Sequence, residues 1–222
     1  MTTIKRIICL ANSRKMSGRC IAGVEFAGEK PGNWIRPVSD REHQEVSEEE
    51  RRYENGRYPE LLDVIDVPLL EHQPNDHQQE NWILDPEYYW EKVGVFDWDG
   101  LQRIAERGGT LWRIGTSTSN GENDRISAKQ ASAETSSLKL VHVDGVRLKV
   151  YAPYHTKRRV QACFQFDEID YALWVTDPRC ETKFLAKKDG NYQLDECYLT
   201  ISLGEPYDGY CYKLVAAVLE KQ

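Results

Sequence analysis

The sequence predicts a mainly β protein with one or two short helices, organised as two tandem β-rich units. Three observations support this prediction. Short apolar runs alternate with turn signals along most of the 222 residues. Five or six such runs crowd the last part of the chain, a spacing typical of a small antiparallel barrel or sandwich. Between the two halves, "GTSTSNGENDRISAKQASAETSS" is small and polar without an apolar period, which indicates a linker or mobile loop.

The first half contains fewer clear strands than the second. We expect strands over residues 4–11, 19–26, 34–39 and 61–70, which are rich in β-branched and aliphatic residues. Pro37 places the third of these at a sheet edge, at its own end or on a bulge. A short helix is expected to begin near Ser47, because Glu50 lies at capping-box spacing from it. These elements define a first barrel over residues 1–115.

A tryptophan-rich insertion follows in residues 81–113. Residues 98–107 show helical spacing of their apolar side chains, with Asp97 as N-cap and the Gly108-Gly109 pair as stop. We therefore expect a helical, tryptophan-rich insertion within the first barrel.

The second barrel is expected over residues 138–222, after a linker over 116–137. Asp144-Gly145 joins two apolar runs and predicts a hairpin. In the run at 160–166, alternation places Gln161, Cys163 and Gln165 on one face and apolar residues on the other. The remaining strands are expected at 171–176, 199–203 and 212–219.

Composition restricts the classes of function. A net charge of −7 argues against a protein that coats nucleic acid with its whole surface, although a local basic groove is compatible with it. The six cysteines are scattered without a CxxC pair, so we expect neither zinc nor a cofactor. No signal peptide or membrane-spanning run is visible, and we expect a reduced, cytoplasmic protein.

Several phrases, in order along nearly the whole chain, resemble the bacterial dual OB-containing domain family. They are "CLANSRKMSGRCIAG", "WIRPVS", "LLDVIDVPL", "QQEN" and "ISLGEPYDGYCYKLVAAV". The resemblance implies two tandem OB-like barrels. It implies nucleic-acid or nucleotide binding only because many OB folds bind such ligands. It identifies no catalytic residues in this sequence.

The first candidate binding residues lie between the first two strands: Asn12, Ser13, Arg14, Lys15 and Arg19. The first hairpin loop of an OB barrel flanks its binding face, where cations and small polar side chains can hold phosphates. The alternative is a turn capped by Asn12 and Ser13, with the cations in water.

Two further cations lie within strand-like runs. Arg36 is expected either to meet an anionic ligand or, as we slightly favour, to pair with Asp63 or Asp66. Lys213 lies in "CYKLVAAVL" and could reach the surface, pair with Glu205 or contact a phosphate.

A second basic cluster precedes the run at 160–166, and it consists of His155, Lys157, Arg158 and Arg159. Tyr151, Tyr154 and Trp174 could supply stacking platforms beside it. The alternative is a solvent-exposed loop without a ligand, which is the commoner structure for such a cluster. For Trp174 we expect a place in the core.

These features favour a non-enzymatic binding module for single-stranded nucleic acid or a nucleotide-type ligand, acting through a local basic groove. The alternative is an adaptor in a bacterial multi-protein system that binds a protein partner through the tryptophan-rich acidic segment 82–98. Steep salt dependence would mark the first function. A third possibility is an enzyme with an unrecognised site, which would need a close carboxylate pair such as Asp177 and Glu205. The familiar phosphate-loop, nucleophile-elbow and metalloprotease motifs are absent.

Overall fold

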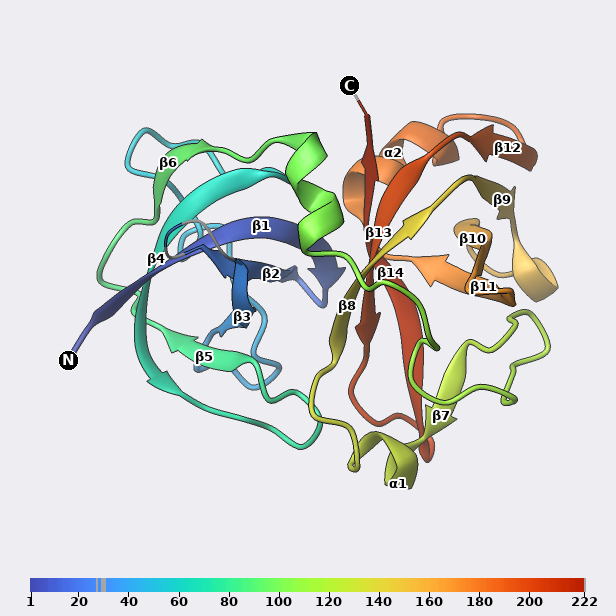
Figure 1. Ribbon diagram of the computed structural model, residues 1–222, viewed down its shortest axis with the longest axis horizontal. Helices are drawn as coiled ribbons and strands as arrows, with labels where there is room; N and C mark the ends of the chain where they lie inside the picture. The colour runs from blue at the N-terminus through green and yellow to red at the C-terminus, as the bar shows by residue number, and fades with distance from the viewer. Residues whose placement is uncertain (27, 29–30, 222) are drawn as a thin grey trace. The chain divides into compact units, whose positions relative to one another are not determined.

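The computed structural model describes residues 1–26, 28 and 31–221, with the backbone alone for His155. The chain divides into two compact units, Met1–Ile104 (unit 1) and Ala105–Gln222 (unit 2). Strands make up most of the regular structure in both units, which confirms the mainly β prediction (Figure 1).

Unit 1 is built from six strands: β1 Thr3–Lys15, β2 Gly18–Phe26, β3 Pro31–Val38, β4 Asp63–His72, β5 Asn81–Leu84 and β6 Glu91–Val95. The ladder runs β1-β2-β3-β5-β4, and β4 pairs back with β1, so five strands close a barrel. The β3–β5 contact is parallel and the other contacts of the barrel are antiparallel. β6 extends the sheet beside the first half of β4.

The closed barrel needs one very close approach between β1 and β2. A Cβ atom at Gly23 would meet the Ile8 carbonyl oxygen at 2.1 Å, so only glycine fits there. Inside, alternate residues of each strand form a buried core. It contains Ile7, Cys9, Ile21, Ile35, Val46, Tyr53, Ile65, Val67, Leu69, Leu84 and Trp90.

Unit 2 repeats the same plan with its first strand in two halves. Its strands are β7 Arg125–Ser127, β8 Leu138–Val143, β9 Val146–Tyr151, β10 Arg159–Phe166, β11 Ile169–Val175, β12 Gly190–Leu194, β13 Cys197–Leu203 and β14 Tyr210–Glu220. The ladder runs β12-β9-β10-β11-β14-β13-β8, with β11 and β14 parallel. β8 and β9 together correspond to β1 of unit 1. β8 pairs with β13 as the first part of β1 pairs with β4, and β9 pairs with β10 as the last part of β1 pairs with β2.

The hairpin predicted at Asp144-Gly145 is therefore wrong. β8 has β13 as its partner, whereas β9 pairs with β10 and β12. The turn residues mark a bend in one long strand that changes partners, and a local signal cannot distinguish such a bend from a hairpin.

Residues 116–137, expected as a linker, belong to unit 2. Their strand β7 pairs with β14, and the helix α1, Ala128–Ala131, begins at a capping box between Ser127 and Gln130. The division of the chain falls earlier, between Ile104 and Ala105. The polar composition of this segment reflects a surface position, since its backbone groups are bonded to unit 2.

The remaining helices are short: η1 Trp98–Arg103, η2 Pro153–His155 and α2 Pro178–Leu185. The expected helix at 98–107 is a 3₁₀ helix that ends four residues early, and Asp97 accepts a bond from the Asp99 N–H as its N-cap. The capping box expected at Ser47 and Glu50 forms at 2.8 and 3.2 Å, although only turns follow it. Among the described residues, no helix is long and apolar enough to cross a membrane.

Asp177 joins α2 to the barrel of unit 2, and its removal is expected to cost stability. One carboxylate oxygen accepts from the N–H groups of Arg179 and Cys180, and the other accepts from the buried N–H of Val218 at 3.0 Å. Asp177→Ala removes an N-cap and leaves a buried donor unpaired, for an expected loss of about 2–4 kcal/mol in urea unfolding. Asp177→Asn keeps one acceptor oxygen and should lose clearly less. Equal losses from both variants would contradict this role.

Candidate functional site

The polar face predicted on β10 is present in unit 2. Ala162, Phe164 and Phe166 are core residues, while Cys163 and Gln165 lie toward the surface. On β9 the same alternation turns Lys149 and Tyr151 outward, beside the buried Leu148 and Val150. The outward side chains of β9, β10 and β11 therefore share one face of the barrel, which we call the β9–β11 face.

Gln161 lies at the centre of the β9–β11 face. It stands opposite Lys149 on one side and Trp174 on the other in the strand register. Its amide oxygen accepts a bond from the Tyr151 hydroxyl at 3.2 Å. Burial, with a contribution from the Cys163 thiol, raises the pKa of Tyr151, so its phenol stays neutral and remains a donor.

Two aromatic rings and a guanidinium group form a platform on this face. The rings of Tyr151 and Trp174 lie with centroids 5.7 Å apart and an interplanar angle of 35°. The Arg159 guanidinium lies 4.2 Å from the centroid of the Trp174 ring. Trp174 is half-buried on the outer face and is not part of the core cluster, so its expected core position is wrong. The strand alternation that buries Leu173 and Val175 turns it outward.

A pocket of about 720 Å³ opens beside the platform. Its lining includes Lys149, Tyr151, Gln161, Asn191 and residues 119–122. Its volume is in the range that takes a drug-sized or nucleotide-sized ligand.

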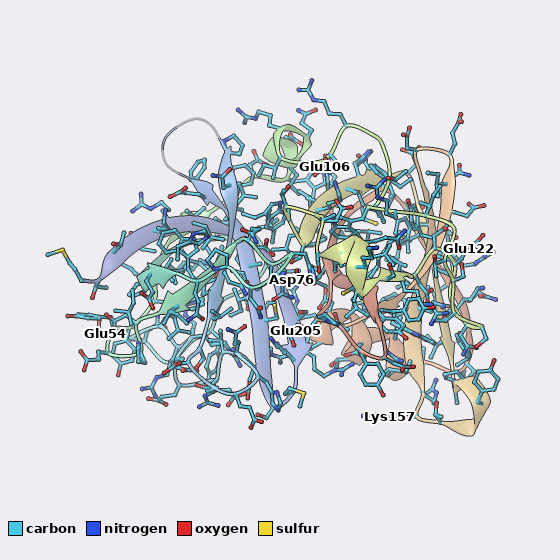
Figure 2. All side chains as sticks on the ribbon, turned by 90° about the horizontal axis from the view of Figure 1, so that it is seen from below. Glu54, Asp76, Glu106, Glu122, Lys157 and Glu205 are labelled. Carbon is cyan, nitrogen blue, oxygen red and sulfur yellow. The ribbon has the colours of Figure 1, made fainter. Side chains whose placement is uncertain are left out.

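The segment 119–122 is held against the edge of the β9–β11 face. The Gln161 amide donates to the Asn120 carbonyl, and Glu122 exchanges two backbone bonds with Ala172 on β11. Figure 2 shows Glu122 on this segment and Lys157 on the connection from β9 to β10. The pocket is thus walled by a segment that sequence reasoning assigned to a linker.

The structure separates the members of the predicted basic cluster. Lys157 is exposed, and Arg159 packs on Trp174. The Arg158 guanidinium binds Asp189 at 2.7 Å, the carbonyl of Leu185 at the end of α2 at 2.9 Å, and the Lys187 carbonyl at 2.7 Å. Tyr154 is 71% exposed and has a positive φ of 49°.

Lys213 lies inside unit 2, with 1% of its surface exposed. Its ammonium donates to the carbonyls of Arg113 and Asn123, each at 2.7 Å. Burial lowers the pKa of Lys213 to about 8. The side chain neither reaches the surface nor pairs with Glu205 through a bond shown in the structure. It anchors the residues that lead to the pocket wall.

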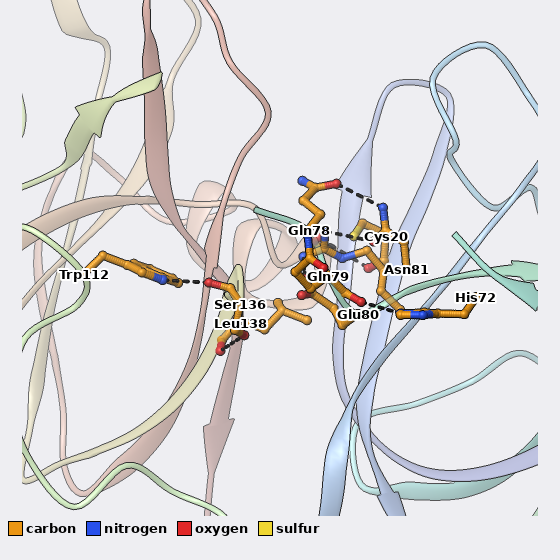
Figure 3. A network of polar contacts seen from close by, with 11 residues as sticks. Cys20, His72, Gln78, Gln79, Glu80, Asn81, Trp112, Ser136 and Leu138 are labelled. Carbon is orange, nitrogen blue, oxygen red and sulfur yellow. Dashed lines mark hydrogen bonds and ion pairs between the residues drawn. The ribbon is translucent and has the colours of Figure 1, made fainter. Parts of the chain in front are cut away.

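Two further sets of hydrogen bonds, made by Trp112 and by Asp124, hold the same region of unit 2. The Trp112 indole N–H donates to the Ser136 carbonyl at 2.8 Å (Figure 3). Asp124 accepts from the N–H and hydroxyl of Thr118 at 2.8 and 2.6 Å. Residues 112–136 are therefore fixed by several polar contacts.

In unit 1, Arg36 is buried in an ion pair with Glu80. Their side chains are 3% and 4% exposed and approach to 3.0 Å. The expected partners were Asp63 or Asp66, but Asp63 pairs with Lys92 and Asp66 pairs with Arg6. Figure 3 shows Glu80 among Gln78, Gln79 and Asn81, just before and at the start of β5.

The first loop is shorter than the sequence suggested. β1 and β2 stay paired to the Lys15–Gly18 pair, so only Met16 and Ser17 form the turn. Asn12 donates to the Pro59 carbonyl at 2.7 Å, and Ser13 is buried with its hydroxyl 3.4 Å from the Cys20 carbonyl. Both side chains thus have structural partners.

The cations of this hairpin lie near a further arginine. Arg14 and Arg19 are opposite each other across the strands. Burial, together with the charge of Arg19, lowers the pKa of Arg51, whose guanidinium lies 4.4 Å from the Tyr58 ring centroid. The hairpin end therefore gathers three arginines of unit 1, Arg14, Arg19 and Arg51.

Each unit contains a closed five-stranded barrel with a parallel contact between its third and fifth strands. This arrangement decides between the barrel and the sandwich that the sequence left open. The model of the dual OB-containing domain family matches residues 5–218. The chain belongs to this family. In OB folds generally, the face of the second and third strands is the one that binds oligonucleotides and oligosaccharides, and in unit 2 of this dual OB-containing domain these strands are β10 and β11. Searches of curated proteins and of solved structures found no match.

Sequence reasoning on this dual OB-containing domain missed Lys149 and the pocket wall at 119–122. Lys149 carried a usable signal, since "VRLKVY" alternates apolar and polar residues. Residues 119–122 carried no such sequence signal, because their position depends on the bridge between Glu122 and Ala172 of β11. Among the described residues, no group of three or more His, Cys, Asp or Glu is placed to hold a metal ion.

Proposed function

We propose that the β9–β11 face of unit 2 binds single-stranded nucleic acid or a nucleotide-type ligand without catalysing a reaction. The observation that carries the proposal is the Tyr151–Trp174 platform with Arg159 against it, on the OB strands that flank the pocket of about 720 Å³. Aromatic rings accept any base by stacking, at about 1–3 kcal/mol per base.

The charges around the platform fit a short contact with a phosphate backbone. Lys149 lines the pocket, and Lys157 and Arg159 lie on or beside the connection that enters β10. Of the two carboxylates in the lining, Asp189 is paired with Arg158 at 2.7 Å and Glu122 lies on the pocket wall. Three cations would release counterions from about three phosphates, which predicts a slope of about −2 for log K against log salt with single strands. A small number of contacts is compatible with a net charge of −7.

The test is fluorescence anisotropy of labelled single-stranded DNA and RNA at several salt concentrations. Trp174→Ala should weaken binding by about tenfold to a hundredfold, the scale of one lost stacking contact, and Trp174→Phe should retain most of it. Arg159→Ala should reduce the salt slope by about one.

The matched control is Tyr88→Ala, which removes an aromatic ring that is 56% exposed in unit 1. The Tyr88→Ala variant should bind the labelled single strands with the affinity of the wild type. A Trp174→Ala variant that folds and binds with unchanged affinity would refute the stacking platform. Binding that does not respond to salt would refute the phosphate contacts.

A further inference from the structure

The outer edge of β6 has no strand partner among the residues that the structure describes in unit 1. In the described part of unit 1, β6 pairs with β4 alone, whereas each barrel strand has partners on both sides. Natural edge strands are usually protected by shortness, by a β-bulge, by proline or by a charged side chain such as lysine. β6 has five residues and a register shift opposite Val64 and Ile65, and the stretch on the Val95 side of that shift contains no proline or charge. β6 reads "EKVGV", and Lys92, its one lysine, forms an ion pair with the buried Asp63 at 2.5 Å.

Apolar side chains are exposed along this edge. Val93 and Val95 are 40% and 66% exposed, and Tyr88 and Tyr89 just before the strand are 56% and 52% exposed. Exposed apolar residues that gather at one place mark interaction sites more often than scattered ones do.

A groove lies directly beside the strand. It has a volume of about 600 Å³, and its walls are the turn at Tyr53–Arg57 and the residues from Tyr89 to Val95. Tyr53 and Trp90 form an isolated parallel bridge at the beginning of the groove. The turn, on which Figure 2 labels Glu54, therefore lies next to β6 with space between them.

The groove lining contains two carboxylates, Glu54 and Glu91, and two cations, Arg57 and Lys92. The cations near it are largely paired: Lys92 with Asp63, and Arg52 with Glu49 at 2.6 Å. Arg57 is a further exposed cation on the turn. With Lys92 paired, the lining retains Arg57 against Glu54 and Glu91, and exposed carboxylates at Glu87, Asp97 and Asp99 flank it in sequence. A partner with basic side chains complements this surface.

We propose that the β6 edge binds an extended segment of a partner protein, with alternating apolar and basic residues, as an added β-strand. Main-chain bonds to the edge would supply affinity, and the groove would take alternate side chains. This site lies on unit 1 and does not depend on the nucleic-acid face proposed for unit 2.

The register identifies a main-chain donor for such a strand. The Phe96 N–H donates to the Leu62 carbonyl of the β4 side at 2.8 Å. Since N–H directions alternate along an antiparallel strand, the N–H of Val95 points to the open edge. Val95→Pro removes this donor without removing a bond to β4, and Val95→Thr keeps it.

The probe is a fluorescein-labelled peptide of alternating valine and lysine, measured by anisotropy with the full chain. Wild type and Val95→Thr should bind, and Val95→Pro should bind about tenfold more weakly, the scale of one or two main-chain hydrogen bonds. A peptide methylated on alternate amide nitrogens should lose binding to the wild type. In hydrogen exchange, the unmodified peptide should slow the amides of Glu91–Val95 in the wild type.

A charge-matched pair of variants separates this site from general attraction to an acidic protein. Glu87→Lys/Glu91→Lys should weaken binding, and Asp144→Lys/Glu168→Lys in unit 2 should not. Equal weakening by both pairs, equal binding to wild type and Val95→Pro, or unchanged exchange at Glu91–Val95 would overturn the proposal.

Discussion

An Arg36→Met variant is expected to lose about 3–5 kcal/mol of unfolding free energy, the scale of a buried ion pair with one partner removed. The remaining Glu80 carboxylate would be only 4% exposed, without its cation at 3.0 Å. Arg36→Met/Glu80→Met removes both charges and should regain much of the loss, because the desolvation cost then disappears.

The measurement is urea unfolding followed together with hydrogen exchange of the amides in unit 1. Arg6→Met is the matched control, since Arg6 and Asp66 form an exposed pair in the same unit at 2.7 Å. That variant should behave much like the wild type. If Arg36→Met and Arg6→Met have equal effects, the Arg36–Glu80 pair is not the buried constraint that the structure indicates.

The second large effect is expected from Lys213→Ala. The carbonyls of Arg113 and Asn123 would lose their donor, and the aliphatic stem would leave a cavity in unit 2. We expect a loss of about 2–4 kcal/mol. The segment between these carbonyls should also become sensitive to protease, because its anchor is gone. Lys183→Ala, at an exposed pair with Glu220, is the control and should leave the segment resistant.

Lys213 also predicts a dependence of stability on pH. Its pKa is lowered from 10.5 to about 8 in the folded chain, so between these values the unfolded chain binds more protons. The free energy of unfolding should therefore rise with pH across this window, relative to a Lys213→Met variant. Below about pH 8 the two curves should run parallel. Parallel curves throughout would mean that the lysine is not desolvated.

The sequence could predict those features that depend on local alternation. "VQACFQF" contains the two-residue period that places Cys163 and Gln165 outside and Phe164 inside, and the structure has this arrangement. Gln161 lies on the same face as Cys163, but it is only 2% exposed and bonds to the Asn120 carbonyl. The motifs also predicted the barrels, since the family match covers residues 5–218. The two-residue alternation of apolar and polar side chains is kept in any fold that buries one face of a strand.

Features that depend on partners distant in sequence could not be predicted. Arg36 pairs with Glu80, 44 positions away, because the parallel β3–β5 contact brings Arg36 opposite Asn81. Asp63 and Asp66 were nearer candidates in sequence, but β4 takes them to Lys92 and Arg6.

Polar composition misled the prediction at residues 116–137 for a related reason. A segment with few apolar residues can still be fixed through its backbone, and here β7 pairs with β14 and Glu122 pairs with Ala172. The same contacts build the wall of the proposed nucleic-acid pocket. In unit 1, Asn12 and Ser13, which were predicted as ligand contacts, have hydrogen-bond partners within the unit, namely the Pro59 and Cys20 carbonyls.

The most direct measurement for the β9–β11 face is photocrosslinking of a short single strand that contains 4-thiouridine, with the crosslinked peptides mapped by mass spectrometry. A base stacked on the platform would lie against Tyr151 or Trp174, so we predict crosslinks in β9 or β11. Excess unlabelled strand should remove these crosslinks, and Trp174→Ala should reduce them. Crosslinks confined to unit 1, such as the β1–β2 hairpin with Arg14 and Arg19, would contradict the assignment of the site.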